Sequence, residues 1–124
     1  MKRSILFATI LVASFQEANA ADVSGSWRVT GSIADNPVET TCTLTQKDAA
    51  LTGTCVRKDG KTVDATGSVK DDAVAWHYSA DYNGDPITIN YNGKLGKDGT
   101  ITGTIIVDPY NAEGEFTATK DTAK

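Results

Sequence analysis

Few side chains in this sequence are of the kinds that carry out acid–base or metal chemistry. The only histidine, His77, lies between Trp76 and Tyr78 in an alternating run, so a strand that turns both aromatic rings inward turns His77 outward. Three acidic residues of the alternating runs fall on the same outward side: Asp64, Asp81 and Glu115. An interior without carboxylates or histidine is poor ground for general acid–base catalysis. The sequence therefore predicts no catalytic residue, no metal site and no cofactor, and it favours a protein that is not an enzyme.

Cys42 and Cys55 are the only cysteines. A redox-active pair would need a C-x-x-C spacing, which the sequence lacks, so we expect a structural disulfide. Placed opposite each other on adjacent antiparallel strands, the two cysteines leave residues 47–50 as a four-residue loop and fix a register, with Leu44 opposite Gly53 and Gln46 opposite Leu51. Closing a loop of this size stabilises a small domain by about 3 kcal/mol.

Aromatic side chains form the most informative group. By alternation, three of them point into the interior from neighbouring strands: Trp76, Tyr78 and Tyr91. Core packing accounts for any single ring, but an indole and two phenols each bring a polar tip that needs a partner. An apolar cavity with a few convergent polar groups is the usual form of a small-ligand site. We therefore predict a ligand-binding site at these three residues, supported by Trp27 and Gln46.

The elements that must position these residues are strands. From Ser24 onward, Thr, Val, Ile and aromatic residues alternate with polar ones, interrupted by Gly, Asp and Asn at short intervals, and no helical period appears. The pattern predicts eight strands, at about 24–33, 38–46, 51–58, 62–70, 73–82, 87–95, 100–107 and 114–120. Short turns link them, among them 58–61, 71–72, 83–86 and 97–99. Short links make consecutive strands neighbours, so the predicted topology is an up-and-down meander.

A meander of eight strands has two exposed edges unless it closes on itself. The sequence therefore predicts an all-β fold, an eight-stranded antiparallel up-and-down barrel with one disulfide. Several of the predicted inward positions are glycines: Gly31, Gly53, Gly67, Gly93 and Gly103. Because glycine weakens a strand, its repeated use indicates either the tight curvature of a narrow barrel or room for a ligand.

The first twenty residues have the order of a secretory signal peptide. Lys2 and Arg3 precede an apolar run over residues 5–15, and Ala18-Asn19-Ala20 forms a small-residue cleavage site. The run is too short to be a transmembrane helix, which needs about 20 residues. We expect cleavage after Ala20, which leaves residues 21–124 as one barrel domain in the periplasm or outside the cell, without a membrane anchor.

Charge narrows the choice of partners. The whole chain has a net charge of −4 at pH 7, and apart from the pairs Lys2-Arg3 and Arg57-Lys58 its basic residues stand singly. A nucleic-acid surface needs clustered Lys and Arg. The outward positions are mostly Thr, Ser, Asp and Lys and form no apolar patch of the kind found at obligate interfaces. We expect a monomer whose partner is a small apolar molecule, and no nucleic-acid partner.

Short motifs resemble the calycins, the superfamily of lipocalins, fatty-acid-binding proteins and avidins. Gly25-Ser26-Trp27 is similar to the G-x-W that opens these barrels, while residues 51–54 and 74–76 resemble the L-T-G-T and V-A-W of the avidin group. Tyr91, followed by Asn-Gly-Lys, resembles a further pocket aromatic of that group. The resemblance implies a barrel with an interior site at Trp76 and Tyr91. It does not imply biotin, because the biotin-binding tyrosine and serine and a later pocket tryptophan are replaced here by Cys55, Arg57 and Ile105.

Two other functions remain open. Ser24-Gly25-Ser26-Trp27 also resembles the S-G-x-W of periplasmic inhibitors of bacterial metalloproteases, exported barrels whose N-terminal trunk enters the protease cleft. Only Ala21-Asp22-Val23 would precede the barrel here, so an inhibitor is the second hypothesis. A barrel cyclase or isomerase that shapes a reactive ligand without a strong base is the third.

Overall fold

The structure is a computed structural model, and it describes residues 22–121. The predicted signal peptide, residues 1–20, lies outside this range. Eight strands fill the described chain: β1 (Gly25–Ile33), β2 (Asn36–Lys47), β3 (Ala50–Arg57), β4 (Thr62–Lys70), β5 (Ala73–Tyr82), β6 (Asp85–Leu95), β7 (Ile101–Asp108) and β8 (Ala112–Lys120). All bounds lie within two residues of those predicted from the alternation.

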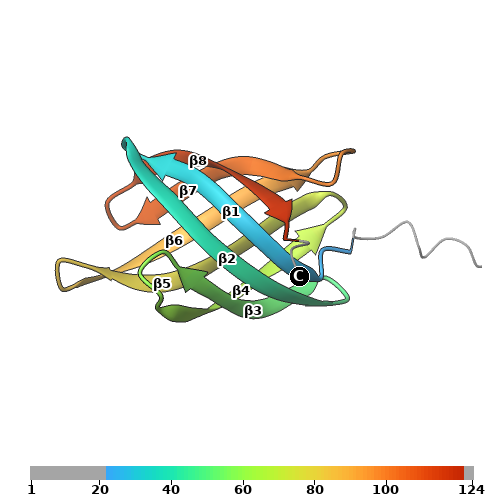
Figure 1. Ribbon diagram of the computed structural model, residues 1–124, viewed down its shortest axis with the longest axis horizontal. Helices are drawn as coiled ribbons and strands as arrows, with labels where there is room; N and C mark the ends of the chain where they lie inside the picture. The colour runs from blue at the N-terminus through green and yellow to red at the C-terminus, as the bar shows by residue number, and fades with distance from the viewer. Residues whose placement is uncertain (1–21, 122–124) are drawn as a thin grey trace, which may run out of the picture.

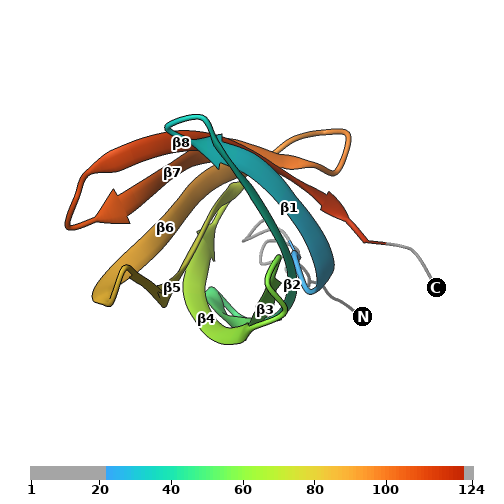
Figure 2. The ribbon, with the colours of Figure 1, turned by 60° about the vertical axis from the view of Figure 1, so that its left-hand side comes forward.

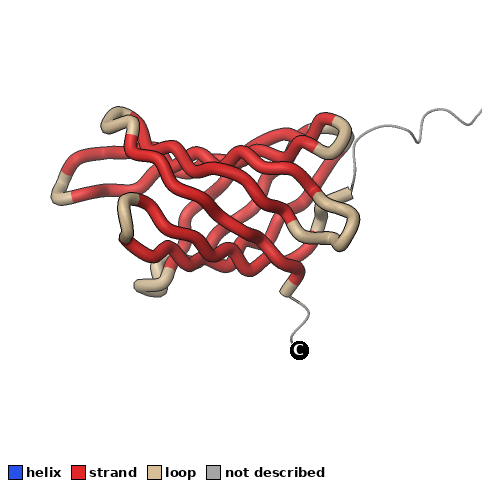
Figure 3. Tube along the Cα trace, turned by 90° about the horizontal axis from the view of Figure 1, so that it is seen from above, coloured by secondary structure: helices blue, strands red, loops and turns tan. Residues whose placement is uncertain are grey.

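The strands close into one antiparallel barrel (Figure 1). Each strand pairs with the next along the chain, and β1 pairs with β8 from Trp27 opposite Lys120 to Ile33 opposite Gly114. The hairpin turns therefore gather at the two ends of the barrel, as the trace in Figure 3 shows. The predicted fold is confirmed.

The disulfide and its register are also confirmed. Cys42 is bonded to Cys55, and the same β2–β3 ladder pairs Leu44 with Gly53 and Gln46 with Leu51. The predicted four-residue loop at 47–50 is wrong in its length. Lys47 pairs with Ala50, which leaves a two-residue turn in which Asp48 takes a left-handed conformation, with φ of 58°. Tight two-residue hairpins require such residues, and Asp adopts them readily.

Residues in the left-handed conformation also shorten two other links between strands. Ala34 and Asp35 both have positive φ, as do Asn83 and Gly84, so each pair forms a complete two-residue turn. Strands β2 and β6 consequently begin at Asn36 and Asp85, two residues earlier than the pattern predicted. The first two residues of each of these strands are of types that favour turns, so the sequence pattern did not predict them as strand.

Side chains alternate across the barrel wall as predicted. The buried core includes Val29, Leu44, Leu51, Val69, Val74 and Ile101. His77, Asp64, Asp81 and Glu115 all lie exposed on the outside, where the Thr66 hydroxyl is 3.2 Å from His77 Nε2. None of the elements described over 22–121 is a helix long and apolar enough to cross a membrane.

The inward glycines permit close contact between strands. A Cβ atom on Gly67 would clash with the backbone carbonyl of Ala75, and one on Gly103 would clash with that of Asn92. A side chain at these positions would push the paired strands apart. The glycines therefore serve the tight curvature of a narrow barrel.

Candidate functional site

The two ends of the barrel differ in how they are covered, and the end at the start of β1 is closed. Val23, just before β1, is fully buried and covers this end. Its N–H donates to Gln46 Oε1 at 2.8 Å, and its carbonyl accepts the Trp27 indole N–H at 2.9 Å. Val23 thus fills the opening while its backbone groups remain hydrogen-bonded. We call this the closed end.

Further contacts hold the cover of the closed end in place. Ser24 Oγ accepts the backbone N–H of Gln46 at 2.9 Å, and Gln46 Nε2 donates to the Asp48 carbonyl at 2.9 Å. Lys120 Nζ donates to the Ser24 carbonyl at 3.1 Å and lies 5.2 Å from the centre of the Trp27 ring. Trp27 and Gln46, two of the predicted site residues, therefore bind the N-terminal segment of the chain itself.

Aromatic rings fill the middle of the barrel. Trp76 stacks on Tyr91 with ring centroids 5.1 Å apart, and Phe116 packs edge-on against both at 5.5 and 5.2 Å. Among the described residues, Trp76 Nε1 is the buried side-chain polar atom without a hydrogen-bond partner in the protein. The barrel thus holds one indole N–H donor that the protein does not use.

A pair of tyrosine hydroxyls lies above this aromatic layer. The oxygens of Tyr78 and Tyr91 are 2.8 Å apart, and both rings are buried. Burial raises the pKa of each tyrosine, and for Tyr91 the neighbouring Tyr78 adds to the increase. The positive charge of Arg57 opposes the increase in both. Both hydroxyls are therefore neutral near pH 7, able to donate and accept hydrogen bonds but poor as acids or bases.

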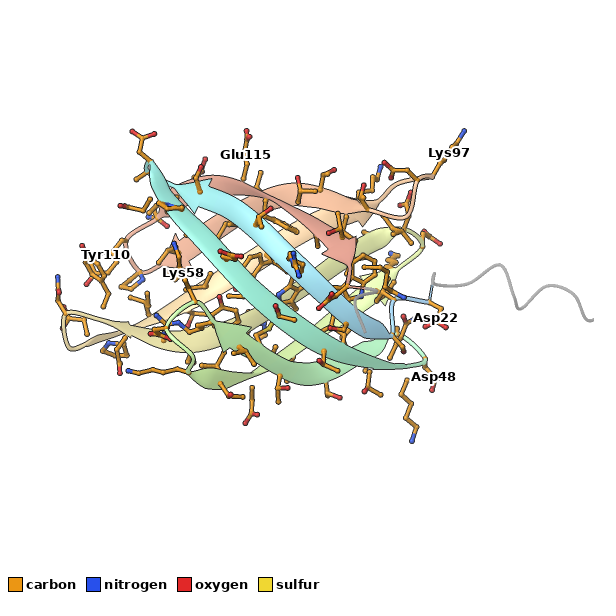
Figure 4. The ribbon with its side chains drawn as sticks, viewed as in Figure 1. Asp22, Asp48, Lys58, Lys97, Tyr110 and Glu115 are labelled. Atoms are coloured by element: carbon orange, nitrogen blue, oxygen red, sulfur yellow. A yellow bond between two sulfur atoms is a disulfide. The ribbon has the colours of Figure 1, made fainter. Side chains whose placement is uncertain are left out.

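The opposite end of the barrel, which we call the open end, contains a cavity of about 370 Å³. Tyr78 forms part of its floor, and residues from β2, β3, β6 and the β3–β4 turn line the rest: Pro37, Val38, Glu39, Thr40, Arg57, Lys58, Asp59 and Ile89. Figure 4 labels Lys58 at this end, with Asp22, Asp48 and Lys97 at the other, and Figure 2 turns the open end toward the viewer. The volume lies at the lower end of the range for small-ligand pockets.

Apolar side chains at the open end are only half-buried. They point inward by the strand alternation but have no counterpart of Val23 above them: Ile33, Val38, Val63, Ile87 and Ile89. Tyr82 and Tyr110 pack against each other on the rim with centroids 6.1 Å apart, and they are 58% and 51% exposed. The open end therefore presents apolar surface around a polar floor.

Hollows on the outer wall have a different lining. One of about 390 Å³ lies over β4 to β7 and is bordered by residues such as Ser68, Lys94 and Thr102. Another of about 570 Å³ lies over β1, β7 and β8, bordered by Thr30, Glu115 and others. Both occur where inward glycines bring strands together. The cavity at the open end is the one that combines inward apolar groups with convergent hydroxyls.

Within residues 22–121, no three His, Cys, Asp or Glu side chains group together as a metal site requires.

The structure divides the predicted site residues into two groups. Tyr78, Tyr91 and Trp76 come together from β5 and β6, whereas Trp27 and Gln46 lie at the closed end. Sequence reasoning missed the lining residues Val38, Thr40, Arg57 and Ile89. The alternation could have found all four, since Val38 and Thr40 share the parity of Cys42, Arg57 that of Cys55, and Ile89 that of Tyr91.

Comparison with known proteins supports the fold alone. No protein-family model and no curated protein matches the sequence. A solved structure described as a redesigned β-barrel, mFAP1, bound to DFHBI is similar to this chain, with a TM-score of 0.56 and 13% sequence identity. The match covers 80% of this chain and 94% of that chain. At this identity, the likeness extends to the small closed barrel and not to its site.

Proposed function

We propose that this protein binds an apolar small molecule in the cavity at its open end. The observation that carries the proposal is the set of half-buried, inward-facing apolar side chains at a cavity to which Tyr78 and Thr40 contribute hydroxyls. A ligand seated there would remove apolar surface of Val38 and Ile89 from water, which stabilises a complex by about 25 cal/mol per Å². The Tyr78 and Thr40 hydroxyls would orient its polar group.

The redesigned barrel mFAP1 supports this proposal, because its structure is bound to DFHBI. The sequence resemblance to calycins points the same way, toward an interior site near Trp76 and Tyr91. In our proposal Tyr91, hydrogen-bonded to Tyr78, and Trp76, stacked on the Tyr91 ring, lie beneath the cavity lining. The free indole N–H of Trp76 offers a donor to an acceptor that reaches past the hydroxyl pair. We propose no role in ligand contact for Trp27 and Gln46, which secure the closed end.

We also propose that the protein acts outside the cytoplasm. The Cys42–Cys55 disulfide is consistent with an oxidising compartment, where such bonds form and persist. The sequence motif at residues 1–20 is the second argument.

The other two hypotheses have less support. The described part of the N-terminal segment, 22–24, packs onto the barrel through Val23 and does not project like an inhibitor's trunk. Acid–base catalysis would need groups that titrate near neutral pH, whereas burial raises the pKa of Tyr78 and Tyr91.

The test uses 1-decanol as a neutral apolar probe and isothermal titration calorimetry of the full chain. We expect saturable binding of one molecule per barrel. Val38→Trp, which fills the cavity, should reduce the affinity at least tenfold. Val56→Trp is the matched control, because Val56 lies on the outer face at 44% exposure. The proposal fails if wild-type protein does not bind 1-decanol, or if both variants affect binding equally.

A further inference from the structure

Arg57 is the least exposed of the charged residues that line the cavity at the open end. It is the last residue of β3, it pairs with Thr40 across the β2–β3 ladder, and its side chain is 29% exposed. Arg57 lines the same cavity as Tyr78 and is close enough for its charge to act on both buried tyrosines. The guanidinium therefore lies beside the polar floor.

The protein uses little of the binding capacity of Arg57. Its acidic partner is Asp59, with Nη2 and Oδ2 3.6 Å apart. This separation exceeds the 2.7–2.9 Å typical of a charge-assisted hydrogen bond. Asp59 is half exposed, and its Oδ1 accepts the backbone N–H of Lys61 at 3.0 Å, so the carboxylate mainly holds the β3–β4 turn. A guanidinium has five N–H donors, and donors of Arg57 remain for a second acceptor.

The other residues that line the cavity determine the kind of ligand that could carry this acceptor. Val38 and Ile89 flank the cavity on the sides, and Tyr78 closes its floor. Glu39 also borders the cavity, but alternation places it on the exposed outer face of β2. A ligand that satisfies all of these contacts has an apolar body and a single anionic end.

We propose, on the basis of the ligand-binding function above, that the open end selects amphiphiles with a carboxylate head, held by Arg57 and the Tyr78 hydroxyl. A planar carboxylate matches the guanidinium fork, and the permanent charge of arginine favours an anion over an alcohol or an ammonium group. The half-buried position of Arg57 strengthens the attraction relative to that of a fully solvated arginine.

The test compares three probes with the same ten-carbon chain, decanoate, 1-decanol and decyltrimethylammonium, by calorimetry on the full chain below their micelle concentrations. We expect decanoate to bind and Arg57→Gln to lower the ratio of decanoate to 1-decanol affinity about tenfold, the effect of losing a charged hydrogen bond. Arg57→Lys, which keeps the charge but not the fork, should give an intermediate ratio. Arg28→Gln removes an equal charge from the outer face of β1 and should leave the ratio unchanged.

Several results would overturn the selectivity. They are an unchanged ratio in Arg57→Gln, equal loss of both affinities, or tighter binding of decyltrimethylammonium than of decanoate. In each of these cases 1-decanol still binds the wild-type protein, so the proposed function survives. If neither decanoate nor 1-decanol binds wild-type protein, both proposals are wrong. Far-ultraviolet circular dichroism and melting curves check that each variant is folded.

Discussion

Both the closed and the open end of this barrel have apolar side chains that point inward, and the two ends differ in whether a further residue covers those side chains. At the closed end, Val23 sits over the inward side chains, and Trp27 and Gln46 satisfy its backbone. At the open end, the inward residues Val38 and Ile89 stay half-buried above a hydroxyl pair. A barrel that needed only stability would be expected to cover both ends, because covering apolar side chains is favourable. The difference therefore separates an end that holds the fold from an end available to a ligand.

The largest expected effect tests the closed end as the stabilising one. Trp27→Ala removes a buried ring and the indole N–H that donates to the Val23 carbonyl. We expect the free energy of unfolding to fall by about 3 to 5 kcal/mol. Tyr82→Ala removes an exposed ring from the open rim and should cost about 0.5 kcal/mol or less. Urea denaturation measures both. Equal losses of unfolding free energy in the two variants would contradict the view that the closed end stabilises the fold more than the open end.

The disulfide tests how the wall of the open end is held. Cys42 and Cys55 pair one inward position below Thr40 and Arg57, so they clamp β2 to β3 beneath the cavity. We expect Cys42→Ala with Cys55→Ala to lower the free energy of unfolding by about 2 to 4 kcal/mol. Denaturation of the double variant measures this loss. A thiol titration of the wild-type protein should find no free sulfhydryl, and two reactive thiols would refute the pairing.

Alkaline pH probes the floor of the open end. Burial raises the pKa of Tyr78 and Tyr91 in the folded state, so the unfolded chain loses these protons first as the pH rises. Their contribution is complete below about pH 10 and is lost above it, by up to about 1.4 kcal/mol per pH unit for each tyrosine. Urea denaturation at pH 9 to 11 gives the slope. The double variant Tyr78→Phe with Tyr91→Phe should have a flatter slope, and an unchanged slope would show that other groups cause it.

The smallest loss expected at the closed end concerns the hydrogen bonds of the cover. Gln46→Ala leaves the Val23 N–H without its acceptor, and we expect a loss of about 1 kcal/mol. Hydrogen exchange should show faster exchange at the amide of Val23 in this variant. Slow exchange at Val23 despite the substitution would mean that the cover is held by packing alone.

Most of the fold followed from the sequence because alternation, turn residues and barrel closure all constrain the same strands. The pairing of Cys42 with Cys55 set the β2–β3 register directly. The two ends were harder to tell apart, because Val23 lies outside any strand, so strand alternation cannot predict whether its side chain points inward. Gln46 was correctly placed on an inward position, but its partner in the N-terminal segment carried no sequence signal. Arg57 was overlooked because a charged residue at a strand end is usually solvated.

The central claim is that a ligand enters at the open end, and amide chemical-shift mapping tests it most directly. Titrating the labelled full chain with 1-decanol should move the amide signals of Val38, Thr40, Tyr78 and Ile89 along one saturable curve. Signals of closed-end residues such as Leu51, Val69 and Ile101 should stay in place. Saturable shifts centred on the closed end or on the outer wall, or no saturable shift at all, would contradict the account.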